Sequence, residues 1–133
     1  MWEKISSIIV AFLIILGAFC LFLLESNVIK FNSNYKISIK NNTDKFVEDL
    51  KLQYNTGELI DIIKEIATKT SWKDKINTST IKDENSIILS YRDNNSNLHK
   101  ETIISFLEKG SSGRVNIIIN SIDENGKLNL IIE

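Results

Sequence analysis

The sequence has no proline, one cysteine and one histidine among its 133 residues. The cysteine, Cys20, lies in an apolar stretch, so the rest of the chain has no thiol for a disulfide framework or a thiolate metal site. The histidine, His99, has no second histidine or nearby cysteine with which to build the usual zinc site or a Ser-His-Asp relay. These scarcities argue against disulfide-stapled folds and the common metal-dependent or triad chemistries.

An excess of basic residues is also missing. Lysine and arginine number 16 against 17 acidic residues, which gives a formal net charge of -1 with both signs interspersed along the chain. Nucleic-acid binding needs a basic stripe and is therefore disfavoured. Isoleucine, asparagine and lysine are abundant, which indicates an AT-rich, bacterial genome; β-branched isoleucine favours strands and asparagine favours turns.

One long apolar run stands near the N-terminus. Residues 5–24 read ISSIIVAFLIILGAFCLFLL without a charge, and at helical rise such a run matches a hydrocarbon core of roughly 30 Å. Trp2 and Lys4 suit the membrane interface, with Trp2 as an aromatic anchor. We predict that residues 1–24 form an uncleaved transmembrane anchor, which contacts the lipid bilayer through residues 5–24.

Other interpretations of this run are a cleaved signal peptide, a lipoprotein signal at Cys20 and a helix packed in a soluble core. A signal peptide would have a shorter apolar region and a small-x-small cleavage site, which residues 22–25 do not supply. Phe19 is too bulky for the residue before a lipidated cysteine. Lysine counting places the following domain in the cytoplasm, but a short N-terminal tail is typical of a signal anchor, so we predict an extracytoplasmic domain at the cell membrane.

Behind the anchor we expect a polar stalk at residues 25–34 and a soluble domain at residues 35–133. Short apolar stretches separated by turn clusters predict antiparallel strands. The expected strands are residues 35–40, 46–54, 72–76, 86–92, 98–107, 114–123 and 127–133. Residues 59–67 are ambiguous, because the spacing of their apolar residues fits a helical face while their neighbours are strand-like; we predict a strand and keep the helix as the alternative.

Turn residues predict three hairpins in this domain. The first joins residues 35–40 to 46–54 through the turn at 41–45, and the second closes around the polar loop 93–97. The third closes at Asn125-Gly126, and Asn-Gly between alternating apolar residues is the strongest short-range hairpin signal. About seven short strands with regularly spaced turns predict a two-sheet sandwich.

The stretch from Lys36 to Ile76 contains an alternating strand, the polar turn Asn41-Asn42-Thr43, a second strand, and an apolar stretch closed by a Ser/Thr-rich turn before Trp72. This pattern resembles small bacterial membrane-anchored immunoglobulin-like modules, although the Cys-Trp-Cys signature of true immunoglobulin domains is absent. The resemblance implies an all-β, immunoglobulin-like antiparallel β-sandwich of about seven strands, preceded by one transmembrane helix. It also implies binding or spacing in the cell envelope, but a fold does not define a function.

Asp93, Asn95 and Asn97 have the oxygen spacing that opens a calcium-binding loop. Leu98 stands where that loop needs glycine, and Ile104 stands where it needs a bidentate glutamate. A plain polar hairpin loop is therefore the favoured interpretation, with calcium binding as the alternative. His99 beside this loop is interpreted as a solvated strand residue or a pH-sensing contact.

The remaining candidate site residues are interpreted as structural. Asp83-Glu84 and Asp123-Glu124 lie in turn-like sequence, and the segment 109–114 lacks the glycine spacing of a phosphate loop. Three aromatic residues could form a binding platform, but core packing is favoured for them; they are Trp72, Tyr54 and Tyr91. The sequence predicts no catalytic residue and no cofactor.

We therefore expect a membrane-tethered, non-enzymatic binding module that presents an edge strand or loop face to another envelope or membrane protein or to a polymer. Segment 127–133 is the candidate edge. The alternative is a small accessory subunit of a membrane complex that contacts its partners through the helix. Small residues in the helix would allow close approach; they are Ser6, Ser7, Ala11, Gly17 and Ala18. An enzyme of unrecognised type would need a deep pocket with positioned titratable groups.

Overall fold

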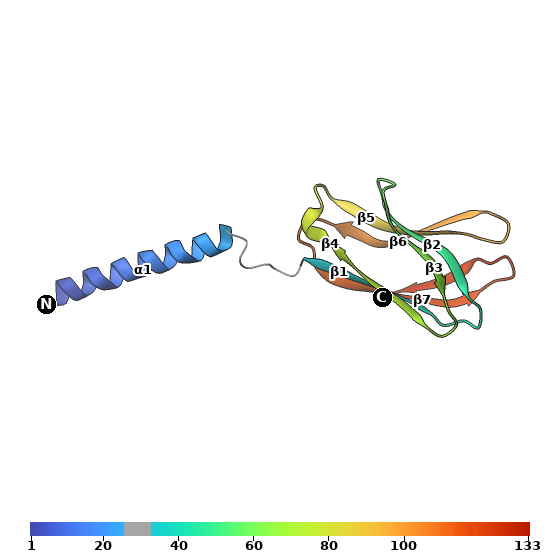
Figure 1. Cartoon of the computed structure of the whole chain (residues 1–133), viewed down its shortest axis with the longest axis horizontal. Helices are drawn as coiled ribbons and strands as arrows, with labels where there is room; N and C mark the ends of the chain where they lie inside the picture. Colours follow the sequence, from blue (N-terminus) through green and yellow to red (C-terminus); the bar gives the residue numbers. More distant parts are fainter. Residues whose placement is uncertain (26–32) are drawn as a thin grey trace. The chain divides into compact units, whose positions relative to one another are not determined.

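The computed structural model describes the backbone of residues 1–25 and 33–133 (Figure 1). The chain divides into two compact units, Met1–Asn32 and Ser33–Glu133. The predicted stalk falls mainly on residues 26–32, outside the described residues, and the side chains of Trp2 and Lys4 also lie outside the description.

The first unit contains one helix, α1 (Trp2–Glu25). Within it, Ile5–Phe22 has a mean hydropathy of 2.8, and none of this stretch is buried against other parts of the protein. Its large apolar side chains within this stretch are exposed on all sides of the helix. The predicted helix is confirmed, and it is long and apolar enough to cross a membrane.

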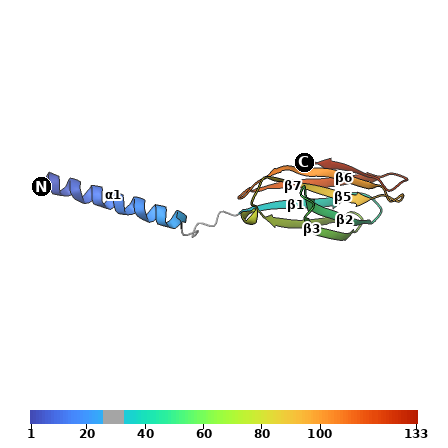
Figure 2. The ribbon, with the colours of Figure 1, turned by 90° about the horizontal axis from the view of Figure 1, so that it is seen from above.

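The second unit is a β-sandwich of two four-stranded sheets (Figures 1 and 2). Its strands are β1 (Asn34–Asn41), β2 (Val47–Tyr54), β3 (Leu59–Ile66), β4 (Ser71–Asn77), β5 (Asn85–Arg92), β6 (Leu98–Leu107), β7 (Gly113–Ile122) and β8 (Leu128–Ile132), with a 3-10 turn at Thr78–Thr80 after β4. Sheet A has the order β4-β1-β7-β8, and sheet B has the order β3-β2-β5-β6. The predicted all-β sandwich is confirmed, and residues 59–66 form a strand as predicted.

Among the described strands, every pair is antiparallel except β1 with β7, which run parallel. The predicted hairpins β5–β6 and β7–β8 are confirmed. The predicted hairpin between residues 35–40 and 46–54 is wrong, because β1 belongs to sheet A and β2 to sheet B. The turn between them carries the chain from one sheet to the other, and β2 instead forms a hairpin with β3.

Asn41 explains why this turn crosses between the sheets. Its side chain is fully buried, and its Nδ2 donates hydrogen bonds to the carbonyl oxygens of Lys45 at 2.7 Å and Ile66 at 3.0 Å. Its Oδ1 accepts from the backbone N–H of Thr43 at 3.0 Å. Backbone groups that leave a sheet need other partners when they are buried. The Asn41 amide supplies those partners and ties the crossover to the end of β3.

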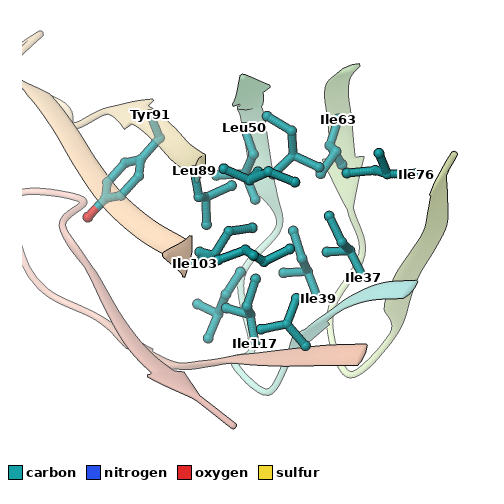
Figure 3. Close-up of a cluster of buried hydrophobic side chains, with 14 of the residues drawn as sticks. Ile37, Ile39, Leu50, Ile63, Ile76, Leu89, Tyr91, Ile103 and Ile117 are labelled. Carbon is teal, nitrogen blue, oxygen red and sulfur yellow. The ribbon is translucent and has the colours of Figure 1, made fainter. Parts of the chain in front are cut away.

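The core lies between the sheets and is built mainly from isoleucine and leucine (Figure 3). Its fully buried apolar members are Ile37, Ile39, Leu50, Leu52, Ile87, Leu89, Leu107, Ile117 and Ile119. Burial of one such side chain stabilises the fold by roughly 1.5–3 kcal/mol. Among the residues whose burial the structure describes, all buried apolar ones belong to the unit Ser33–Glu133, so this unit has a hydrophobic core of its own.

Strands β2 and β3 share a kink. Along β2 the buried residues Val47 and Leu50 are three positions apart, and their cross-strand partners Ile66 and Ile63 are also three apart. A regular strand would bury every second residue. The kink lies at Asp49, whose φ of 55° is rare for a residue with a side chain. The helix-like spacing of apolar residues in 59–67 is therefore the result of a kinked strand.

Candidate binding surfaces

The sheet order leaves four edge strands, β4 and β8 in sheet A and β3 and β6 in sheet B. Charged side chains on an edge strand discourage pairing with another chain. Strands β3, β4 and β6 each carry lysine and acidic residues, whereas β8, Leu128–Ile132, carries no charge. Of the edges in the described sandwich, β8 is therefore the least protected, and the prediction of segment 127–133 as an edge is confirmed.

The backbone of β8 presents hydrogen-bonding groups on its free side. The N–H of Glu133 donates to the carbonyl of Asn116 at 2.9 Å, and the N–H of Asn116 donates back at 3.0 Å. Because the backbone groups of successive residues point to opposite sides of a strand, those of Leu130 and Ile132 point away from β7. The side chains of Ile131 and Ile132 are 42% and 39% exposed. The edge thus combines outward backbone groups with exposed apolar side chains.

A groove of about 810 Å³ opens where β2 and β5 of sheet B separate, and the β7–β8 hairpin of sheet A also contributes to its lining. The ladder between these strands ends at the pair Lys51 and Ser90, and the earlier part of β2 pairs with β3 only. Phe46, Ile62 and Leu98 are exposed apolar residues in the groove lining. Ligand pockets commonly measure about 300–1,000 Å³, so the groove has room for a small ligand or a peptide side chain.

The β5–β6 loop is organised around the carboxylate of Asp93. Oδ1 accepts from the backbone N–H groups of Asn95 and Asn97, both at 2.9 Å. Oδ2 accepts from Nδ2 of Asn97 at 3.1 Å and lies 2.9 Å from Nε2 of His99. The contact with His99, aided by the bonds from Asn97 and Asn95, lowers the pKa of Asp93 from 3.8 to about 2. His99 in turn stacks on the ring of Tyr91, with ring centroids 5.0 Å apart.

The three residues of the candidate calcium loop lie together in the structure, but their polar groups form hydrogen bonds with other groups of the protein. Asp93 accepts the hydrogen bonds just described, and Nδ2 of Asn95 donates to Oδ1 of Asn125 at 3.4 Å. In residues 1–25 and 33–133, no three His, Cys, Asp or Glu side chains are grouped so that they could hold a metal ion. The geometry of Asp93, Asn95 and Asn97 is that of a hydrogen-bonded hairpin loop.

The tips of the β5–β6 and β7–β8 hairpins, which belong to different sheets, dock on each other. The N–H of Asn94 donates to the carbonyl of Asn125 at 2.8 Å, and a Cβ atom on Gly126 would lie 2.6 Å from Oδ1 of Asn94. Behind the tips, the hydroxyl of Tyr91 accepts from the N–H of Leu128 at 2.9 Å. Sequence reasoning missed this contact, although the shared pattern Asp-x-Asn-x-x-Leu at 93–98 and 123–128 marks two loops of the same form.

We predict that Asp93→Asn lowers stability at neutral pH and flattens the acid part of the stability profile. The folded-state pKa of Asp93, about 2, lies below its unfolded value of 3.8, so its contribution is present above pH 3.8 and is lost as pH falls toward 2. Urea unfolding of residues 33–133 between pH 5 and pH 2 measures this loss. His99→Gln removes the largest cause of the low pKa and should flatten the same part of the profile. Unchanged profiles in both variants would contradict the assignment.

The other candidate residues from the sequence lie in the core or in connections between strands. Tyr91 is buried in the core, and Tyr54 and Trp72 are partly buried against it, so the prediction of core packing for these aromatic residues is confirmed. Asp83 and Glu84 are exposed in the connection between the 3-10 turn and β5. Segment 109–114 connects β6 to β7, as expected for a strand connection.

Comparisons of this chain with known proteins identify no family. No protein-family model and no curated protein matches the chain. One solved structure, described as "NMR structure of the protein from Eubacterium rectale", is similar over 76% of this chain and 89% of its own, with 16% sequence identity and a TM-score of 0.47.

Proposed function

We propose that this chain is a membrane-tethered, non-enzymatic binding module of the cell envelope. In this proposal α1 is the anchor, and the sandwich captures an extended segment of another envelope or membrane protein by strand addition to β8. The observation that carries the proposal is the uncharged free edge of β8, the one edge of the described sandwich without a charged side chain. The immunoglobulin-like character and the extracytoplasmic position of the domain belong to the same proposal.

Strand addition uses the groups that β8 offers. Backbone N–H and C=O groups of Leu130 and Ile132 would bond to the incoming strand and supply affinity, because main-chain pairing does not depend on sequence. Selectivity would come from the neighbouring side chains, Ile131 on the outer face of sheet A and Ile132 on the inner face. The partner segment is therefore expected to be extended and apolar where it lies beside these two residues.

The anchor part of the proposal is supported by the composition of α1. Its stretch Ile5–Phe22 carries no charge and lies uncovered by the rest of the described protein. A helix with apolar side chains on every face is stable in lipid and would aggregate in water. A tethered domain without an evident reaction chemistry suits a role in holding a partner at the membrane.

We predict that Ile132→Pro strongly weakens partner capture while the domain stays folded. Proline removes the N–H that points to the free side of β8, and the ladder bond between Glu133 and Asn116 is kept. To measure capture, a photo-crosslinking residue replaces Ile131 in the full chain, and the chain is irradiated in membranes of the source cells. The yield of adduct with an extended segment of one protein should fall by about tenfold or more in the Ile132→Pro variant.

Two controls separate the backbone contribution from other effects. Ile132→Ala removes the side chain but keeps the N–H, so it should keep most of the adduct. A crosslinker at Thr102, which is exposed on β6 in the other sheet, should not give this adduct. An adduct that survives Ile132→Pro at the native yield, with a native circular dichroism spectrum, would refute strand addition at β8.

A further inference from the structure

The outer face of sheet A concentrates positive charge. Lys36 in the middle strand β1 is paired with Lys75 of β4 on one side and Arg114 of β7 on the other. Strands in a sheet are about 4.8 Å apart, so these three side chains stand next to one another on the same face. Along the same face, Lys73 and Lys40 extend the row to five cations. The chain as a whole has a net charge of -1, so composition alone does not explain this concentration.

These cations form no ion pairs in the described structure, although Glu133, which is bonded through its backbone to Asn116, lies on the same face at the end of β8. Within the described residues, the ion pairs are Lys69 with Asp44 and His99 with Asp93, and neither pair involves the five cations. Asp74 is adjacent in β4 but is paired with the inward-pointing Ile37, so it lies on the other face of the strand, where its Oδ1 accepts from the N–H of Lys75. Like charges opposite each other destabilise a sheet. An anion outside the protein would relieve this repulsion.

The face is shaped for such an anion. A hollow of about 500 Å³ lies over it, and its lining combines four cations with one acid, two neutral polar residues and one isoleucine: Lys36, Lys73, Lys75, Arg114, Asp74, Ser38, Asn116 and Ile37. Lysine and arginine are the usual partners of phosphate oxygens, and serine and asparagine add neutral donors. The hollow therefore collects hydrogen-bond donors and positive charge in one place.

The neighbouring residues point to a lipid surface as the source of the phosphate. Lys40 is paired with Ile118, and Ile118 is paired with the exposed Ile131, so aliphatic side chains adjoin the cations on the same face. Basic and apolar residues side by side are typical of surfaces that bind the headgroup region of an anionic membrane. We propose that the outer face of sheet A binds the anionic phospholipid headgroups of the membrane that holds α1. This inference rests on the anchor of the proposed function and adds a second, electrostatic contact.

The test uses the full chain in lipid nanodiscs. In a Cys20→Ser background, Ser71→Cys carries a fluorophore on the outer face of β4 beside Lys40, and Thr102→Cys carries it on sheet B as the control reporter. Discs contain either phosphatidylcholine alone or phosphatidylcholine with phosphatidylglycerol, each with a headgroup spin-labelled quencher. The Ser71→Cys reporter should be quenched in the anionic discs only, and added salt should reverse the quenching. The Thr102→Cys reporter should stay bright in both.

A charge-matched pair of variants identifies the residues responsible. Neutralising the face by K36Q, K73Q, K75Q and R114Q together should lower the bound-to-free ratio on the order of tenfold or more. The control neutralises four lysines outside that face by K51Q, K64Q, K100Q and K109Q, with the same change in net charge, and should leave quenching unchanged.

Equal quenching in the two kinds of disc, or equal loss in the two variants, would overturn the inference. A chain that stays in the discs and is crosslinked at β8, but shows no anion-dependent quenching, would overturn this inference alone. A chain recovered in the aqueous fraction without discs would overturn the anchor, and with it both proposals.

Discussion

Replacement of Asn41 by alanine is expected to lower the free energy of unfolding of the sandwich by about 3 kcal/mol or more. The change removes hydrogen bonds from the buried side chain to the carbonyls of Lys45 and Ile66 and from the N–H of Thr43. Each buried group left without a partner costs roughly 1–3 kcal/mol. The effect should be large because the carbonyl of Ile66 is buried at the end of β3 and the Asn41 amide ties the crossover to it.

Urea unfolding of the fragment 33–133, followed by circular dichroism, measures this loss. The neighbouring Asn42→Ala is the matched control, because Asn42 is exposed and its backbone N–H bond to Ile119 does not involve the side chain. The control should change the free energy of unfolding by roughly 0.5 kcal/mol or less. Equal losses in the two variants would show that the buried amide does not hold the crossover.

Ile63→Ala is expected to cost about 2–4 kcal/mol of stability, whereas Ile62→Ala should cost less than about 1 kcal/mol. Ile63 is 3% exposed in the core opposite Leu50, while Ile62 is 43% exposed on the outer face. The same chemical change at adjacent positions therefore tests which way the strand faces. A helix at residues 59–67 would place both isoleucines on one face and give similar costs.

Urea unfolding of both variants in the fragment 33–133 measures the two losses of unfolding free energy. The dependence of the unfolding free energy on urea concentration should stay close to the native value in each, because neither change alters the surface exposed on unfolding by much. Similar losses at the two positions would contradict the strand orientation and the kink at Asp49.

The two proposed surfaces use different parts of sheet A. Strand addition would extend the sheet beyond the free side of β8, whereas headgroup binding would use the outer face around Lys36. An edge and a face of one sheet can be occupied together, because hydrogen bonds lie in the plane of a sheet and side chains project from it. The arrangement suits a module that holds a partner close to the membrane surface.

The amino-acid sequence determined the elements that depend on neighbouring residues. The uncharged run of residues 5–24 specifies the helix, and polar loops such as Asp93 to Asn97 specify the hairpins whose strands they join. Residues 59–66 show the limit of this reasoning. Their apolar spacing predicts a helical face, and it became a strand because Ile63 and Ile66 pair with the kinked β2.

Only the tertiary structure decided which strands share a sheet. Asn41-Asn42-Thr43 predicts a hairpin turn, yet it becomes a crossover because the Asn41 side chain bonds to the carbonyls of Ile66 and Ala67 at the end of β3, more than twenty residues away. Likewise, Lys36, Lys75 and Arg114 are dispersed in the sequence and become neighbours only when β1 pairs with both β4 and β7. Local periodicity records which side of a strand is buried, whereas the choice of partner strand depends on contacts between distant segments that form only in the folded core.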